Sequence, residues 1–372
     1  MRIQAIRQEQ ERLFIEWENG DQADFSFFWL RDHCQHPESL NPETLQRTVE
    51  TFALPSVPPV SDVRLIDDNR SLQIDWRNEN FLSEYTSEFL HQFGVPVKLE
   101  PVYSLWNNAL QDTIPDFQFT EVVEDDDALQ AMLEAFLSYG LVTFSGMDSN
   151  LEATRTLLER VGYIRQSIFG GLWDFSNNQK HSDSAYTSVG IGLHTDSTYC
   201  IDPPGMQLLH CLAFDGEGAY NQFADGFHAA DVIRREDPEA YACLKETVVP
   251  AHYFEPGVHL RAAHPVITED EDGNLEQICF NNFDRSPFKL SAEKQALFYR
   301  AYGRFHELVN DPENQVRFQL RPGRAVWFDN WRTLHARTSF SGFRHLAGGY
   351  TNREDYISKL ITLRGQKLWR QN

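Results

Sequence analysis

Cysteine is scarce in this chain, with 5 residues among 372, at positions 34, 200, 211, 243 and 279. Their number is odd and their spacing irregular, and no C-x-x-C motif occurs, so a disulfide framework is not expected and a reducing compartment is favoured. No apolar run approaches the roughly 20 residues that a membrane span needs. The N-terminus carries acidic residues early and lacks the apolar core of a signal peptide. We therefore expect a cytoplasmic protein that does not contact membranes.

Basic side chains are also in short supply. The sequence has 33 Lys and Arg against 55 Asp and Glu, which gives a formal net charge of -22. A surface this acidic repels phosphate backbones, so nucleic acid is not an expected partner. The charge favours a cationic substrate only mildly, and solubility explains it better. The composition, 41% hydrophobic and 13% aromatic, suits one large packed domain with a small second one and argues against disorder.

The first 95 residues are predicted to form a small β-rich domain. Three runs have strand-like composition and are separated by residues that favour turns; they cover 13–17, 24–30 and 71–76. Residues 96–120 contain prolines and aromatics without a clear period, and we interpret them as a connecting segment.

Residues 121–372 show a different pattern, of amphipathic helices and short strands. Apolar residues at helical spacing predict helices over 128–139, 151–161 and 291–308. Many short strands with turn residues between them indicate a mainly β domain, a jelly roll or double-stranded β-helix with the helices packed outside it. The strand candidates are 141–144, 206–212, 277–280, 316–320 and 325–328.

The motif that carries chemistry is His194-Thr195-Asp196, followed much later by His335. Two imidazoles and one carboxylate hold non-haem Fe(II) on one face and leave the other face open. Chance alone predicts about two H-x-[DE] motifs in this composition and the chain has three, so the spacing is weak evidence. Context favours this one, because a short apolar run precedes it and residues i and i+2 of an extended backbone project to the same side. A hydrogen-bonded core histidine is the alternative for His335, and these residues alone leave both open.

A candidate cation for a 2-oxo acid follows His335. Arg344 could hold the distal carboxylate of such a co-substrate, because its planar guanidinium matches a carboxylate with two hydrogen bonds and keeps its charge. Arg337 is a rival for the same role.

Several longer stretches, in the same order, resemble the γ-butyrobetaine and trimethyllysine dioxygenases. The resemblance covers nearly the whole chain and implies a double-stranded β-helix with a small N-terminal domain. It also implies that His194, Asp196 and His335 bind Fe(II), that Arg344 pairs with 2-oxoglutarate, and that the enzyme hydroxylates a C–H bond with release of succinate and CO₂. The matching stretches include Trp29-Leu30-Arg31-Asp32-His33-Cys34, His194-Thr195-Asp196-Ser197-Thr198-Tyr199, Asn281-Asn282-Phe283-Asp284-Arg285, Asp329-Asn330-Trp331-Arg332 and Arg344-x-Leu346-x-Gly348-x-Tyr350.

The resemblance further implies a small trimethylammonium substrate. Such a group offers no hydrogen-bond donor, so charge and aromatic faces must recognise it. The positions that match the family's aromatic cage are Phe169, Trp173, Tyr186 and Tyr350. Any one of them alone would be better explained as an ordinary core aromatic.

The other end of the substrate is left open. Asp183 matches an acidic position that faces the α-ammonium group in the trimethyllysine enzyme, whereas Asn281 and Arg285 could hold a carboxylate or phosphonate. γ-Butyrobetaine, trimethyllysine and 2-(trimethylammonio)ethylphosphonate therefore all stay candidates. The rival functions are a non-catalytic jelly-roll protein that binds a quaternary amine and a zinc hydrolase, since the same ligands suit zinc.

Relatives often hold structural zinc in the N-terminal domain through three cysteines and a histidine. Here Cys34, His36 and His91 match three of these positions and Ser39 replaces the remaining cysteine. Because structural zinc normally takes four ligands, the sequence leaves open whether this domain binds zinc. It also does not decide the oligomeric state, for which a homodimer is kept as one option.

Overall fold

The chain divides into two compact units, which we describe separately. The computed structural model describes residues 1–95, 102–175 and 188–365. Within these ranges no helix combines the length and the apolar character that crossing a bilayer requires.

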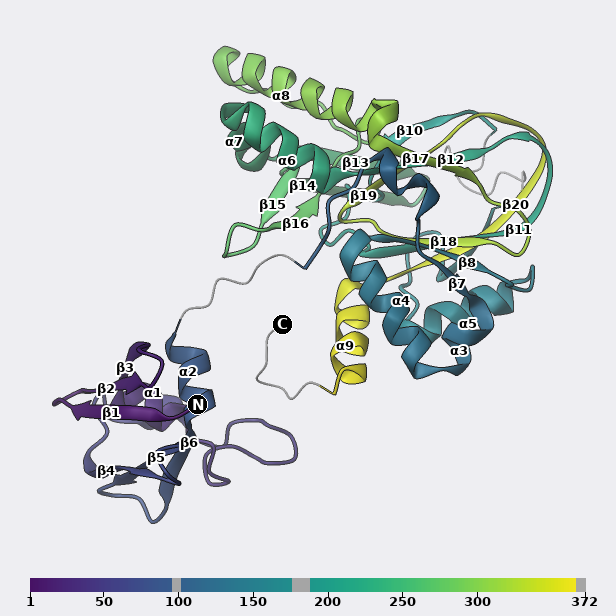
Figure 1. Ribbon diagram of the computed structural model, residues 1–372. Coiled ribbons are helices and arrows are strands. Elements are labelled where there is room, and N and C mark those ends of the chain that lie inside the picture. The colour runs from purple at the N-terminus through teal and green to yellow at the C-terminus, as the bar shows by residue number, and fades with distance from the viewer. Residues whose placement is uncertain (96–101, 176–187, 366–372) are drawn as a thin grey trace. The chain divides into compact units, whose positions relative to one another are not determined.

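The N-terminal unit holds two three-stranded antiparallel sheets, and a helix follows the last strand of each (Figure 1). Each helix begins where a hydroxyl side chain caps it: Ser26 accepts from the Trp29 N–H, and Thr86 accepts from the Phe89 N–H. Residues 27–30, expected to continue a strand, are therefore helical, because the Ser26 cap starts a helix there. The elements are β1 (Ile3–Gln8), β2 (Arg12–Trp17), β3 (Gln22–Ser26), α1 (Phe27–Asp32), η1 (Thr51–Ala53), β4 (Val60–Ile66), β5 (Ser71–Trp76), β6 (Leu82–Thr86) and α2 (Ser87–Gly94).

The second unit is built on two sheets that form the expected jelly roll. The larger sheet has the order β7-β8-β18-β11-β20-β9 and the smaller one β10-β19-β12-β17. Among the described strands of these sheets, only the β7–β8 pair is parallel. The strands of the larger sheet are β7 (Asp116–Gln118), β8 (Leu141–Ser145), β18 (Ala325–Asp329), β11 (Met206–Gly218), β20 (Phe340–Thr351) and β9 (Leu172–Phe175). Those of the smaller sheet are β10 (Ile191–His194), β19 (Thr333–Arg337), β12 (Tyr220–Asp225) and β17 (Gln315–Gln319).

The described residues of the second unit also form two hairpins and two short 3₁₀ turns. The hairpins are β13 (Val249–Glu255) with β14 (Val258–His264), and β15 (Ile267–Glu269) with β16 (Leu275–Ile278). The turns are η2 (Asn108–Asp112) and η4 (Pro312–Asn314).

Alternation along the strands separates an inner core from two outer ones. In β18, Val326 and Phe328 join the core between the sheets, whereas Ala325 and Trp327 face the helices outside. In β19, Leu334 and Ala336 face outward, so the residue between them, His335, projects into the space between the sheets.

Helices cover the outer faces of both sheets, as Figure 1 shows. One group packs on the larger sheet and consists of α3 (Phe119–Glu124), α4 (Asp126–Tyr139), α5 (Leu151–Val161) and α9 (Arg353–Leu363). The other packs on the smaller sheet and consists of α6 (Gly226–Glu236), α7 (Pro238–Glu246) and α8 (Ala292–Asn310). The three helices expected from the sequence are confirmed as α4, α5 and α8, whereas α3, α6, α7 and α9 were not expected.

The predicted connecting segment is largely part of the second unit. Trp106 is buried in the core between the sheets, and its indole N–H donates to the Tyr139 carbonyl at 2.7 Å. Further on, β7 adds the edge strand to the larger sheet by pairing with β8. Residues 102–120 therefore belong to the jelly-roll unit, because they bury apolar surface and complete a sheet rather than bridge two domains.

Candidate active site

The two histidines of the motif are direct cross-strand neighbours. In the antiparallel β10–β19 pair, His194 stands opposite His335. Directly opposed residues project to the same face with their Cβ atoms about 5 Å apart. Their ring centroids are 4.3 Å apart. The pairing of two short strands therefore places two of the three candidate ligands side by side without help from a loop.

Asp196 reaches the histidines from a turn and not from the extended strand that we expected. Strand β10 ends at His194, and Ser197 has a left-handed φ of 58°. The side chain of Asn330 holds this turn: its Oδ1 accepts from the Asp196 N–H at 2.7 Å, and its Nδ2 donates to the Pro204 carbonyl at 2.9 Å. The turn carries the carboxylate back toward both imidazoles.

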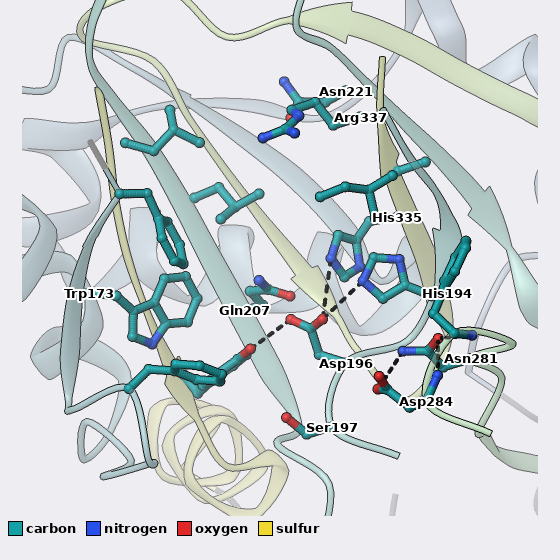
Figure 2. Close-up of a pocket in the computed structure, with 18 of the residues that line it drawn as sticks. Trp173, His194, Asp196, Ser197, Gln207, Asn221, Asn281, Asp284, His335 and Arg337 are labelled. Atoms are coloured by element: carbon teal, nitrogen blue, oxygen red, sulfur yellow. Dashed lines mark hydrogen bonds and ion pairs between the residues drawn. The ribbon is translucent and has the colours of Figure 1, made fainter. Parts of the chain in front are cut away.

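The three side chains converge on one small region, as Figure 2 shows. Oδ1 of Asp196 lies 3.1 Å from Nε2 of His194 and 3.7 Å from Nε2 of His335. All three possible ligand atoms lie within 4.8 Å of one another, and no other described residues form such a group. Nδ1 of His194 donates to the Gly192 carbonyl at 2.8 Å, which makes Nε2, the nitrogen beside Asp196, the atom that would bind a metal.

The electrostatics of this group suit a divalent cation. Burial alone would raise the pKa of Asp196, but the two imidazoles outweigh it and hold that pKa far below its ordinary value. Burial and the neighbouring His194 lower the pKa of His335 to about 3, so this imidazole is neutral at pH 7. Burial also opposes protonation of His194, yet Asp196 raises the His194 pKa overall. An ionised carboxylate and two buried nitrogens are the donors that Fe(II) takes in such sites.

Arg344 supplies a buried cation in the same cavity. Its side chain comes from the inner face of β20 and is 8% exposed, with its guanidinium 5.7 Å from the Phe340 ring centre. Burial and the neighbouring Arg337 lower the pKa of Arg344 to about 9, so it stays charged at pH 7. No carboxylate of the described residues pairs with it. A buried guanidinium without an anion fits the distal carboxylate of 2-oxoglutarate.

Arg337 lines the cavity too, but the Val189 carbonyl accepts from its Nη2 at 2.5 Å. Arg337 therefore has a structural hydrogen bond, whereas no such bond joins Arg344 to another described residue.

Two amide side chains were missed by sequence reasoning. Asn221 stands opposite Arg337 in the β12–β19 pair, and Gln207 stands opposite Tyr350 in the β11–β20 pair. Both line the cavity, and buried Nδ2 of Asn221 and Oε1 of Gln207 have no partner among the described residues. Buried polar atoms normally have partners, so these two are candidates to contact bound ligands.

One wall of the cavity is aromatic. Trp173 packs edge-on against Tyr350 with ring centroids 4.6 Å apart, and Phe169 lines the same cavity. Three of the four predicted cage positions are thus brought together. Tyr186, and with it Asp183, lies outside the described residues.

The predicted contacts for an anionic substrate tail are separated. Asn281 lines the cavity, but its Nδ2 donates to Asp284 at 2.7 Å and its Oδ1 accepts from the Phe283 N–H. Arg285 is not among the lining residues; its guanidinium lies over the rings of Tyr299 and Tyr302, at 5.7 and 5.6 Å. Asn281 and Arg285 therefore do not form a joint anion site in this structure. Figure 2 shows Asn281 with Asp284, apart from Asn221 and Arg337.

The zinc candidates of the N-terminal unit do not converge. His91 is bound to Asp21, with Nε2 and Oδ2 2.6 Å apart, and His36 stacks on Phe81. Cys34 accepts from the Ser83 hydroxyl at 2.9 Å. Within the described part of the chain, only the His194 group brings three candidate ligands within reach of one ion.

Comparison with known families decides the assignment. Residues 104–350 match the model of the taurine catabolism dioxygenase TauD, TfdA family. The chain belongs to the TauD, TfdA family. Residues 4–91 match a second model, the gamma-butyrobetaine hydroxylase-like N-terminal domain. Together with the site geometry, this membership makes the chain an Fe(II)/2-oxoglutarate-dependent dioxygenase.

The similarity to two named relatives covers most of this TauD-family chain. A trimethyllysine dioxygenase from Meyerozyma guilliermondii is 31% identical, over 94% of this chain and 92% of its own length. A gamma-butyrobetaine dioxygenase from Pseudomonas sp. (strain AK-1) is 32% identical, over 94% and 93%. Among solved structures, a taurine dioxygenase from Burkholderia xenovorans aligns with a TM-score of 0.48 at 18% identity, over 62% of this chain and 85% of its own.

Proposed function

We propose that this dioxygenase hydroxylates a small trimethylammonium compound. The observation that carries the proposal is the aromatic wall formed by Trp173 and Tyr350, which lies beside the iron ligand Asp196 and lines the same cavity. Aromatic faces attract a cation that has no hydrogen-bond donor. Relatives named for trimethyllysine and for gamma-butyrobetaine resemble this chain to the same degree, so they support the class of substrate and do not select one compound.

The division of labour within the cavity follows from its residues. His194, Asp196 and His335 would hold Fe(II), which when bound supplies oxygen activation coupled to conversion of 2-oxoglutarate into succinate and CO₂. Arg344 would hold the distal carboxylate of 2-oxoglutarate. Trp173 and Tyr350 would fix the substrate's cationic end and exclude water, so that one C–H bond lies near the iron.

Steady-state turnover of γ-butyrobetaine, trimethyllysine and 2-(trimethylammonio)ethylphosphonate, read as succinate release, tests the proposal. We expect turnover of at least one, with O₂ consumed in step. The matched control for that compound carries a tert-butyl group in place of trimethylammonium, which has the same shape without the charge; it should bind poorly. No turnover with any of the three compounds contradicts the proposal, and loss of a compound without O₂ consumption or succinate release would point to a hydrolase.

A substitution in the aromatic wall distinguishes binding of the cationic substrate from binding of 2-oxoglutarate. Trp173→Leu removes the aromatic face and should raise KM for the cationic substrate by about 2- to 30-fold, the range for a cation–π contact of about 0.5–2 kcal/mol. Affinity for 2-oxoglutarate should not change, because Trp173 pairs with Gly348 of β20, which is four residues along the strand from Arg344. An equal loss for both ligands would contradict the assigned roles.

A zinc ion in the N-terminal unit, a homodimer and a cytoplasmic location stay predictions. Metal analysis of purified protein tests the first: a full equivalent of zinc that is lost in Cys34→Ala would support it. The hydrogen bond between His91 and Asp21 argues against a zinc site, because the His91 imidazole would have to give up this bond to bind the metal.

A further inference from the structure

Tyr350 contributes to two parts of the site at once. Its ring forms the aromatic wall with Trp173, and its hydroxyl donates to Oδ2 of Asp196 at 2.6 Å. The side chain is 5% exposed and comes from the inner face of β20. Its main-chain carbonyl accepts from the Arg165 N–H at 2.8 Å, so the residue is fixed at both ends.

The hydrogen bond distinguishes the two oxygens of Asp196. Oδ1 is the oxygen that lies nearest both imidazoles, at 3.1 and 3.7 Å from their Nε2 atoms. Oδ2 is the oxygen that accepts from Tyr350. A carboxylate free to rotate could present either oxygen, or both, to a metal. Here the phenol hydroxyl occupies one of them.

We propose that Tyr350 is a positioning residue for the iron site: its hydroxyl holds Asp196 so that Oδ1 alone is directed at the metal. The side chain of Asn330 fixes the backbone of Asp196, whereas the Tyr350 hydroxyl fixes the rotation of the Asp196 carboxylate. A carboxylate that binds through one oxygen takes up one coordination position and keeps the opposite face open for 2-oxoglutarate and O₂. This inference rests on the iron site and does not depend on which trimethylammonium compound is the substrate.

Tyr350 also connects the aromatic wall, on which the substrate would pack, to a ligand of the metal. A substrate that packs on the Tyr350 ring contacts a side chain whose other end holds an iron ligand. The wall and the ligand group are therefore connected through a single side chain.

Metal binding to Tyr350→Phe tests the proposal without turnover. The variant keeps the ring and removes one oxygen atom. Anaerobic titrations with Fe(II), and with Co(II) as a spectroscopic probe, should give a dissociation constant about 10- to 100-fold higher than that of the unchanged protein, as for other partners of metal ligands. The visible Co(II) spectrum should also change, because the carboxylate can then bind through both oxygens.

One control separates positioning from a general effect of substitution. Tyr253→Phe removes a buried tyrosine hydroxyl that donates to Glu255 at 3.0 Å, and Tyr253 is not among the residues that line the cavity. It should bind Fe(II) and Co(II) as the unchanged protein does, and circular dichroism should show both variants folded.

The outcomes are distinct. Weaker metal binding and an altered Co(II) spectrum only in Tyr350→Phe support the proposal. Unchanged affinity and spectrum in Tyr350→Phe overturn it, and so does an equal loss in Tyr253→Phe, because the effect would then be structural. Failure of the proposed substrate class appears elsewhere, as absent turnover of all three compounds in the unchanged protein.

Discussion

Replacing Arg344 by methionine should abolish tight binding of 2-oxoglutarate. The guanidinium is 8% exposed, and no carboxylate of the described residues neutralises it. Truncating one partner of a buried, hydrogen-bonded charge pair costs about 2–5 kcal/mol. At about 1.4 kcal/mol for each factor of ten, the dissociation constant of 2-oxoglutarate should rise about 30- to 4,000-fold.

An anaerobic titration measures this directly. Fe(II) and 2-oxoglutarate chelated in such a site absorb visible light, so the band reports binding without turnover. Arg344→Lys should fall between the two extremes, because lysine keeps the charge and loses the two-point geometry. Arg337→Met is the comparison variant and should lose less, since Arg337 already donates to the Val189 carbonyl.

The same substitution makes a second, opposite prediction for the ligand-free protein. Arg344→Met removes a buried cation that no carboxylate of the described residues neutralises and that Arg337 repels, so thermal stability without 2-oxoglutarate should stay equal or rise. The reasoning is refuted if Arg344→Met binds 2-oxoglutarate as tightly as the unchanged protein, or if Arg337→Met loses more affinity.

Three further substitutions test the ligand group and the scaffold. His335→Ala removes one of three ligands and should abolish the visible band at all Fe(II) concentrations that saturate the unchanged protein; a persisting band would show that His335 is not a ligand. Arg332→Met removes the cation that pairs with the fully buried carboxylate of Asp225. It should lower the free energy of unfolding by about 3–5 kcal/mol in urea titrations. A loss near zero would show that this ion pair does not stabilise the fold. Burial lowers the pKa of His210 to about 4, below the unfolded value of 6.5. Protonation of His210 therefore costs no free energy of unfolding above pH 6.5, and it lowers that free energy by up to about 3 kcal/mol as the pH drops to 4. His210→Gln cannot take up this proton and should show a smaller loss over the same pH range; an unchanged pH dependence would show that His210 does not cause it.

Local signals in the sequence predicted helices well where caps and periodicity agreed. Helix α4 begins after Asp125, whose side chain accepts from the Asp127 N–H, and ends at Gly140 with a left-handed φ of 64°. The sequence failed where a local cap overrode strand-like composition. Residues 27–30 are aromatic and apolar, yet the Ser26 cap makes them helical.

The site was predictable only as far as its motif. The ligand residues were identifiable, but the turn that places Asp196 near the histidines was not. At Ser197 this turn needs a left-handed φ, which residues other than glycine rarely adopt. Neither Asn221 nor Gln207 was assigned a role in ligand binding from the sequence. They become candidates only when strand register places them on inner faces, opposite Arg337 and Tyr350.

Anomalous diffraction at the iron edge tests the central claim most directly. Crystals grown without oxygen, with Fe(II) and 2-oxoglutarate, should show one iron peak within bonding distance of Nε2 of His194, Nε2 of His335 and Oδ1 of Asp196. A peak at another place, or no peak between these three atoms in crystals that contain Fe(II), would contradict the account.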